Sequence, residues 1–234
     1  MDEEILEQIK KAANDSLKNP GKTNVTLPKD HIKDGDNFII VFRHGESEDN
    51  VKKIFSGWRD STDITEVGEA QAKALQKGLN KLHIDMVITS DQVRSKHTAK
   101  IAFATHPNLD QIIWKKDWRI KERNYGDLNG KSKEEAMKLN PIEAIKWRRG
   151  YETLPPGGES IQMVEKRVGP FLDELISYIK RDKVNVALSA HGNSMRAIRR
   201  YFEKLTVLEE MTVENPLGTD FALYRVVSGQ APPL

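Results

Sequence analysis

The chain contains no cysteine, so disulfide frameworks, thiolate nucleophiles, iron–sulfur clusters and cysteine-ligated zinc sites are excluded. It also has no large excess of charge of either sign, because 37 lysines and arginines against 35 aspartates and glutamates leave a formal charge of +2. Dedicated nucleic-acid binders and polybasic membrane proteins are usually strongly basic. We therefore expect neither a nucleic acid nor a membrane surface as a partner.

Long apolar runs are missing as well. No segment approaches the roughly 20 apolar residues that span a bilayer, and the acidic residues 1–4 lack the basic and apolar regions of a secretory signal. These features favour a cytoplasmic location. Repeats and low-complexity tracts are absent too, while 38% apolar residues among 234 are enough to build a core in one or two domains.

Short apolar, β-rich segments alternate with segments of helical periodicity along the chain. This alternation predicts an α/β fold in which helices cover a mostly parallel sheet. We expect an interruption of one helix near Pro141 and a kink of another at Gly169-Pro170. The predicted strands cover residues 37–42, 84–89, 111–114, 184–190 and 220–227, and the predicted helices cover residues 66–80, 93–104, 132–149, 159–180 and 193–204.

The first 36 residues form a separate predicted unit. Residues 1–20 have the pattern of an amphipathic helix, which Asn-Pro-Gly at residues 19–21 ends, and the polar residues 21–36 look like a linker. We favour a helix packed on the domain surface over a dimerisation or partner arm, because its amphipathicity is ordinary for a surface helix. Either a monomer or a homodimer is compatible with the sequence. The predicted division is an N-terminal helix and linker at 1–36, a main domain at 37–228 and a short tail at 229–234.

Two histidines follow two of the predicted strands directly. Residues 43–45 read Arg-His-Gly after the strand at 37–42, and residues 191–194 read His-Gly-Asn-Ser after the strand at 184–190. Functional groups of open α/β sheets lie just beyond the carboxyl ends of the strands. The glycine after each histidine permits close approach of a ligand, and the helix that starts near Asn193 offers N–H groups to an anion.

A single histidine at a strand end is more often a polar stop than a functional group, and His31, His83, His97 and His106 have no such context. Two histidines with an adjacent arginine favour a functional site. A metal site is one reading, but the spacing matches no metal-ligand motif. A phosphoryl-transfer site is the better interpretation, because a neutral imidazole can attack phosphorus and guanidinium groups stabilise the phosphoryl oxygens.

The segment Arg-His-Gly-Glu-Ser at residues 43–47 resembles the signature of the histidine phosphatase superfamily. Further blocks resemble its cofactor-dependent phosphoglycerate mutase branch, and the similarity covers about residues 37–227 with every block in order. The resemblance implies a three-layer α/β/α sandwich like that of phosphoglycerate mutase. The blocks are Phe-Ser-Gly-Trp at 55–58, Thr-Ser at 89–90 followed by Arg94, Glu-Arg-Asn-Tyr-Gly-Asp-Leu-Asn-Gly at 122–130, Trp-Arg-Arg-Gly-Tyr at 147–151, Gly-Glu-Ser at 158–160 and Ala-His-Gly-Asn-Ser at 190–194.

The resemblance implies a role for each matching residue. His44 corresponds to the nucleophile that becomes phosphohistidine, and Arg43, Arg94 and His191 to the groups that clamp the phosphoryl group. Glu122 corresponds to the general acid/base, for which a pKa near the working pH is expected. The residues that correspond to substrate-binding positions are Asn50, Ser56, Gly57, Arg123, Tyr125, Lys133, Arg148, Arg149, Gly192 and Asn193.

Positive charge is concentrated in one stretch, since residues 115–149 hold 11 Lys/Arg and 6 Asp/Glu. Such a run is usually a solvated face. With the resemblance, it implies interconversion of 3- and 2-phosphoglycerate, primed by 2,3-bisphosphoglycerate and without a metal. A phosphatase of small phosphorylated metabolites is the alternative, and a non-catalytic binding protein is a third.

Two departures from the family concern the surroundings of the site. The connection after Tyr151 is shorter than in longer family members, and residues 215–219 match only loosely. The tail after Val227 is also short, so the sequence leaves open whether it covers the site.

Overall fold

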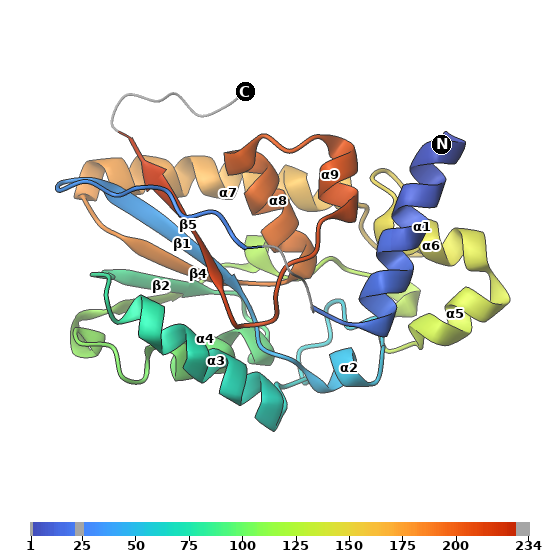
Figure 1. The fold of residues 1–234 in the computed structure, drawn as a ribbon, viewed down its shortest axis with the longest axis horizontal. Coiled ribbons are helices and arrows are strands. Elements are labelled where there is room, and N and C mark those ends of the chain that lie inside the picture. Colours follow the sequence, from blue (N-terminus) through green and yellow to red (C-terminus); the bar gives the residue numbers. More distant parts are fainter. Residues whose placement is uncertain (1, 22–25, 228–234) are drawn as a thin grey trace.

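A five-stranded sheet forms the centre of the structure, a computed structural model that describes residues 2–21 and 26–227 (Figure 1). The strand order is β3-β2-β4-β1-β5, with β5 antiparallel to β1 and all other neighbours parallel. The prediction of a mostly parallel sheet is therefore confirmed. The strands are β1 (Asn37–Arg43), β2 (Met86–Thr89), β3 (Ile113–Lys116), β4 (Val186–Ala190) and β5 (Phe221–Val226).

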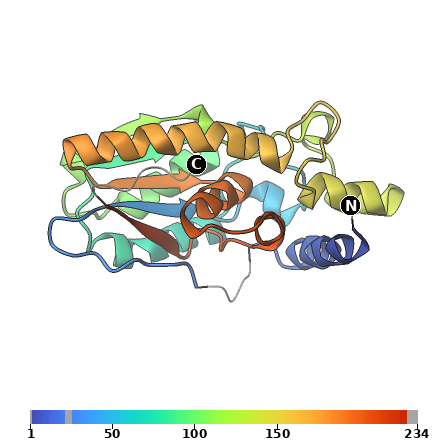
Figure 2. The ribbon, with the colours of Figure 1, turned by 90° about the horizontal axis from the view of Figure 1, so that it is seen from above.

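Helices cover both faces of this sheet (Figure 2). Alternate residues of a strand point to opposite faces. In β1, Ile39 and Val41 accordingly lie in one apolar cluster, whereas Ile40 and Phe42 lie in another. The first cluster includes residues of α7 (Ile161–Asp182) and α8 (Gly192–Glu203), and the second residues of α3 (Glu66–Leu79) and α4 (Val93–Phe103). The three-layer α/β/α prediction is confirmed.

Local signals set most helix ends. The Thr65 side chain accepts a hydrogen bond from the Gly68 N–H and caps α3, as its position in the sequence predicted. The predicted break near Pro141 is also found, because α5 (Lys133–Leu139) ends at Asn140 and α6 (Pro141–Arg149) begins at the proline. At the predicted kink, α7 continues as one helix through Pro170.

Some boundaries differ from the prediction. Strand β2 begins two residues later than expected, and β3 lies two residues further along the chain. Several short helices have too few residues for a periodic signal and were not predicted. They are α2 (Glu48–Val51), α9 (Val207–Thr212) and the 3-10 turns η1 (Leu109–Gln111), η2 (Trp118–Ile120) and η3 (Gly126–Leu128).

The N-terminal helix α1 (Glu3–Lys18) packs beside α6 and α9 (Figure 1). Its buried residues Ile9 and Ala13 share an apolar cluster with Ile145 of α6 and Met211 of α9. This is the surface packing that the sequence favoured.

Residues 27–30, which belong to the predicted linker, pack against the sheet. Leu27 is buried, and the backbone of Pro28 and Asp30 bonds to Leu223 of β5. Part of the predicted linker and the predicted tail at 229–234 lie outside the described residues. Within the part of the chain that the structure describes, no helix is long and apolar enough to cross a bilayer.

Candidate active site

The two predicted histidines meet at one edge of the sheet. Strands β1 and β4 are parallel neighbours with Arg43 opposite Ala190, so the residues that follow them emerge together. The His44 N–H donates to the Ala190 carbonyl at 3.1 Å, and the ring centroids of His44 and His191 are 5.1 Å apart. Both side chains are buried. The sheet register thus brings together two residues that lie far apart in the sequence.

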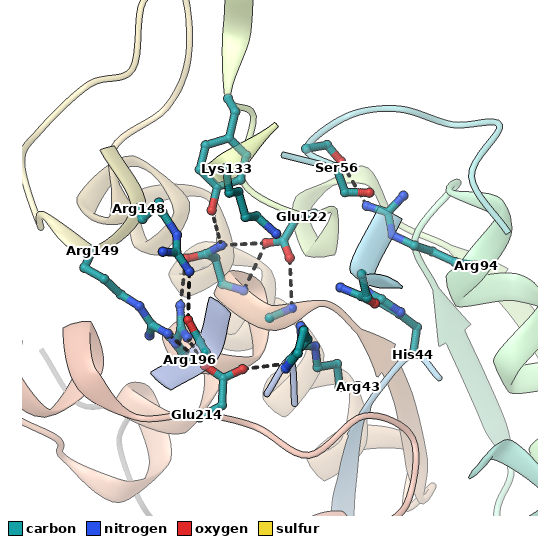
Figure 3. Close-up of a pocket in the computed structure, with 17 residues that line it drawn as sticks. Arg43, His44, Ser56, Arg94, Glu122, Lys133, Arg148, Arg149, Arg196 and Glu214 are labelled. Carbon is teal, nitrogen blue, oxygen red and sulfur yellow. Dashed lines mark hydrogen bonds and ion pairs between the residues drawn. The ribbon is translucent and has the colours of Figure 1, made fainter. Parts of the chain in front are cut away.

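A polar pocket opens beside these strand ends (Figure 3). It is lined by every predicted site residue except His191 and Arg123, both of which are fully buried. Four lining residues were not predicted, namely Ser16, Pro20, Arg196 and Glu214. The predicted residues that line the pocket are Arg43, His44, Asn50, Ser56, Gly57, Arg94, Glu122, Tyr125, Lys133, Arg148, Arg149, Gly192 and Asn193.

The surroundings of His44 fix its tautomer. Its Nδ1 lies 2.7 Å from the Gly45 carbonyl oxygen, which can only accept a hydrogen bond, so Nδ1 carries the proton. The lone pair is then on Nε2. Burial, together with the charges of Arg94 and Arg43, lowers the pKa of His44 well below its usual range. His44 is therefore a neutral imidazole with one nitrogen suited to attack an electrophile.

His191 is held by a different contact. Its Nε2 lies 2.8 Å from the Ser90 hydroxyl, while its buried Nδ1 has no hydrogen-bond partner among the described residues. Burial, followed by the charge of Arg94, lowers the pKa of His191 well below its usual value. A buried ring nitrogen without a partner is costly unless a ligand satisfies it.

Arg94 is anchored by backbone carbonyls. Its Nη1 donates to the Arg59 carbonyl and its Nη2 to the Gly57 carbonyl, both at 2.9 Å. Gly57 has a φ of +45°, and a Cβ there would collide with the Asn129 Oδ1. Only glycine therefore suits this turn without strain. The Nε atoms of Arg94 and Arg43 are buried without partners among the described residues, which leaves two N–H donors beside the histidines.

Glu122 is the anion at the start of α8. Its Oε2 accepts from the Gly192 N–H at 3.0 Å, and its Oε1 from the Asn193 N–H at 3.0 Å. The N–H groups expected to face a ligand thus bind this carboxylate. Burial would raise the pKa of Glu122, but hydrogen bonds from Arg123 and Asn193 and the charge of Arg43 lower it to about 2. Surrounded only by the protein's own groups, Glu122 is therefore ionised, and its pKa is not near the working pH as the sequence predicted.

A second group of cations lies across the pocket from His44 and Arg94 (Figure 3). Burial lowers the pKa of Arg148 to about 10 and that of Arg149 to about 9. The pKa of Lys133 is lowered to about 7, by burial first and then by repulsion from Arg148. Packing these cations together is unfavourable by itself, which indicates a surface built to receive negative charge.

Lys133 should make substrate affinity depend on pH. Its charge is lost as pH rises through about 7, so the KM for an anionic substrate should rise from pH 7 to 8.5, approaching roughly tenfold per pH unit. The measurement is KM against pH for the wild type, Lys133→Arg and Lys133→Met. Lys133→Arg should keep a low, flat KM, and Lys133→Met a high, flat KM. An unchanged pH slope in Lys133→Met would contradict this assignment.

Glu214 joins the arginines of the pocket. Its Oε1 accepts from Arg43 Nη1 at 2.8 Å, and its Oε2 accepts from Arg149 Nη2 at 2.8 Å and from Arg196 Nη2 at 3.0 Å. Burial would raise the pKa of Glu214, but Arg196, Arg149 and Arg43 hold it far below its usual range. The carboxylate therefore aligns three guanidinium groups. No local sequence pattern marks Glu214, because its arginine partners lie far from it along the chain or are identified only by the fold.

Arg123 and Tyr125 form a buried stack. The Arg123 guanidinium lies 4.6 Å from the centroid of the Tyr125 ring and is fully buried. Its three side-chain nitrogens have no hydrogen-bond partner among the described residues. The stack supports the pocket wall at Tyr125, whose ring also packs on Phe55.

Asn50 and Ser56 also line the pocket, and Ser56 lies on the same side as Arg94 (Figure 3). Asn50 Oδ1 accepts hydrogen bonds from Ser47, and the Ser56 hydroxyl donates to the buried Asp49 carboxylate at 2.8 Å. Across residues 2–21 and 26–227, no three His, Asp or Glu side chains gather closely enough to hold a metal ion.

The sheet topology and the paired histidines are those of a known class of protein. The model of the histidine phosphatase superfamily (branch 1) matches residues 39–217, which include four of the five strands, β1 from its third residue, and most of the pocket, so the chain belongs to this superfamily. Individual similar proteins carry a more specific name than the superfamily. The 2,3-bisphosphoglycerate-dependent phosphoglycerate mutase of Cytophaga hutchinsonii is 38% identical over 72% of this chain and 78% of its own length. The protein of the same name from Nitrobacter winogradskyi is 37% identical, covering 80% and 91%.

Solved structures agree with this placement. A mycobacterial glucosyl-3-phosphoglycerate phosphatase superposes with a TM-score of 0.70 at 25% identity, covering 80% of this chain and 92% of its own. YhfR of Bacillus stearothermophilus has a TM-score of 0.68 at 25% identity, covering 80% and 90%. The predicted resemblance to cofactor-dependent phosphoglycerate mutases within the histidine phosphatase superfamily is thereby confirmed.

Proposed function

We propose that this chain is an isomerase that interconverts 3-phosphoglycerate and 2-phosphoglycerate, the mutase step of glycolysis and gluconeogenesis, through a phosphohistidine at His44. The observation that carries the proposal is the two-sided pocket. A neutral His44 beside Arg43 and Arg94 suits a transferring phosphoryl group, and Arg148 and Arg149 on the other side suit a second anionic group. A mutase holds substrates with more than one anionic group and must keep them while they reorient.

In this mechanism Nε2 of His44 attacks the phosphorus of a bound phosphate ester. The N–P bond forms as the P–O bond to the sugar-acid oxygen breaks, and the departing oxygen receives a proton. Arg43, Arg94 and His191 place N–H donors around the reacting phosphorus, where they stabilise charge on its oxygens throughout the transfer. The unpartnered Nε atoms of the two arginines support this role.

Glu122 is the group that supplies and removes the proton. Its pKa of about 2 reflects the hydrogen bonds from Arg123 and Asn193 and the charge of Arg43, which outweigh burial. A phosphorylated substrate adds several negative charges beside it and offsets Arg43, which raises the carboxyl pKa toward the value an acid/base needs. Glu122 then protonates the departing oxygen, and in the reverse transfer it takes the proton from the attacking hydroxyl.

The priming compound, 2,3-bisphosphoglycerate, fits the donors of the pocket. Buried N–H groups without partners among the described residues occur at Arg43, Arg94 and Arg148, and a molecule with two phosphates and a carboxylate can satisfy donors on both sides. When bound, this compound supplies the phosphoryl group that charges His44. No metal enters the proposed reaction. A cytoplasmic monomer or homodimer acting on small phosphorylated metabolites is part of the same proposal.

A phosphatase is the alternative function, and a specific observation favours it. One structural relative is a phosphatase by name, and hydrolysis needs the same His44 chemistry with water as the acceptor. The two functions differ in their products. With 3-phosphoglycerate and a trace of 2,3-bisphosphoglycerate, 31P NMR should show 2-phosphoglycerate forming much faster than free phosphate. Free phosphate as the main product would establish the phosphatase instead.

A further inference from the structure

The C-terminal half of α1 forms one side of the pocket. Ser16 and Pro20 line it, although α1 precedes the region that the superfamily model matches. Ala12 and Ser16 are four residues apart in α1, a spacing that places helical residues on one face, and Pro20 follows the end of the helix. Ile9 and Ala13, which pack on α6 and α9, precede Ala12 and Ser16 by three residues each, so one face of α1 both packs on these helices and borders the pocket.

Ser16 holds Arg148. The Arg148 Nη2 donates to the Ser16 hydroxyl at 2.9 Å, and the same hydroxyl donates to the Ala13 carbonyl at 3.1 Å. Arg148 is buried and lines the pocket, and its Nη1 has no hydrogen-bond partner among the described residues. One nitrogen of this guanidinium is therefore fixed by α1, while the other is left for a ligand.

Arg149 contacts the same helix. Its Nη2 donates to the Ala12 carbonyl at 3.3 Å, beside its ion pair with Glu214. The C-terminal half of a helix carries the negative end of the backbone dipole, which favours nearby cations. Ser16 and the Ala12 carbonyl thus orient both arginines of the second anion-binding group.

The helix is fixed in this position. Ile9 and Ala13 are fully buried against Ile145 and Met211. Beyond Pro20, Gly21 has a φ of +65° and lies so close to Leu217 that a Cβ would collide with that side chain. Contacts on both sides of Ser16 therefore keep α1 against the pocket.

We propose that α1 is a specificity-determining wall of the active site, in which Ser16 positions Arg148 to bind the anionic group of the substrate remote from the reacting phosphoryl group. The wall also restricts the pocket to small phosphorylated acids. This inference rests on the proposed function for the identity of the substrate, but the role of Ser16 can be tested by binding alone.

The first test compares Ser16→Ala with Ser177→Ala. Ser177 is a matched control, because it is exposed on α7 and its hydroxyl also donates to a carbonyl of its own helix. Calorimetry should show 3-phosphoglycerate binding about 5- to 10-fold more weakly to Ser16→Ala, with binding of inorganic phosphate unchanged within about twofold. The two-anion ligand uses Arg148, whereas phosphate needs only the side of His44. Ser16→Thr, which keeps the hydroxyl, should restore binding, and Ser177→Ala should match the wild type.

Kinetics give a second readout of the same variants. The KM for 3-phosphoglycerate should rise in Ser16→Ala by the same factor, with kcat changed by less than about twofold. Equal binding of 3-phosphoglycerate by Ser16→Ala and the wild type would overturn the proposal. If the wild type only hydrolyses its substrate, the proposed mutase function fails, while the calorimetric comparison still decides the role of Ser16.

The wall itself is tested by Ile9→Ala, which loosens the packing of α1 without touching the two apolar clusters on the sheet. Hydrolysis of a larger ester, p-nitrophenyl phosphate, should rise at least about threefold relative to turnover of 3-phosphoglycerate. An unchanged ratio in a protein whose melting temperature has fallen would show that the helix does not limit access.

Discussion

Replacement of His44 by alanine is expected to lower turnover of 3-phosphoglycerate by about 10⁴-fold or more, because the reaction loses its nucleophile. The same variant should incorporate no acid-labile phosphate from 2,3-bisphosphoglycerate. Stability should change little by comparison, since His44 makes one side-chain hydrogen bond, to the adjacent Gly45. The measurements are steady-state kinetics and phosphate labelling of the purified protein.

A matched control is His83→Ala. His83 is exposed and pairs with Asp85 far from the pocket, so its loss should leave both rate and labelling unchanged. A His44→Ala protein that still becomes labelled would assign the nucleophile to another residue, and His191 would then be the first to test.

Glu122→Gln is expected to have the second-largest effect, a fall in kcat of about 10²- to 10⁴-fold for phosphoglycerate. The amide cannot deliver a proton to the departing oxygen. With p-nitrophenyl phosphate, whose leaving group departs without protonation, the fall should be much smaller. Equal losses with both substrates would indicate that Glu122 only positions other groups. Glu134→Gln, on an exposed ion pair with Lys53, is the control.

The same substitution should destabilise the protein. Both carboxylate oxygens of Glu122 accept hydrogen bonds from backbone N–H groups, those of Gly192 and Asn193. The NH₂ of a glutamine must therefore face a donor, at a cost of about 1–3 kcal/mol in stability.

The lowered pKa of Glu122 determines the direction in which stability changes with pH. Ionised Glu122 stabilises the folded state fully above pH 4.5, and this contribution is lost as pH falls through about 2. Glu122→Gln has no carboxyl group at this position, so its folded-state stability should lack this part of the loss at low pH.

Local sequence signals accounted for the sheet and for one side of the pocket. The strands that precede His44 and His191 are short apolar segments, and a histidine–glycine pair after each strand shows in the sequence itself. Because parallel neighbouring strands place such residues at one edge, fold class and paired histidines could both be anticipated. Strand ends shifted by about two residues where hydrogen bonding to neighbours, rather than residue type, sets the boundary, as in β2 and β3.

On the other side of the pocket, the family resemblance predicted Lys133, Arg148 and Arg149, but not the residues that hold these arginines in place. Arg43 and Glu214 are separated by 171 residues and Arg148 and Ser16 by 132, so only the folded chain reveals these contacts. The charge state of Glu122 is a further case. The sequence places it between Lys121 and Arg123, but besides burial and the adjacent Arg123 N–H its pKa depends on Asn193 at the start of α8 and on Arg43, which only the fold brings close. The N-terminal helix was foreseen as a surface element, but not as part of the pocket.

Transfer of the phosphoryl group from His44 to a sugar acid, and not to water, is the central claim, and a pulse–chase experiment tests it most directly. The protein is charged with 32P-labelled 2,3-bisphosphoglycerate, freed of excess reagent and mixed with unlabelled 3-phosphoglycerate. The proposed mechanism predicts that the label leaves His44 within one turnover and appears in the phosphoglycerates and bisphosphoglycerate. Release of the label chiefly as free phosphate, at a rate independent of 3-phosphoglycerate, would contradict it.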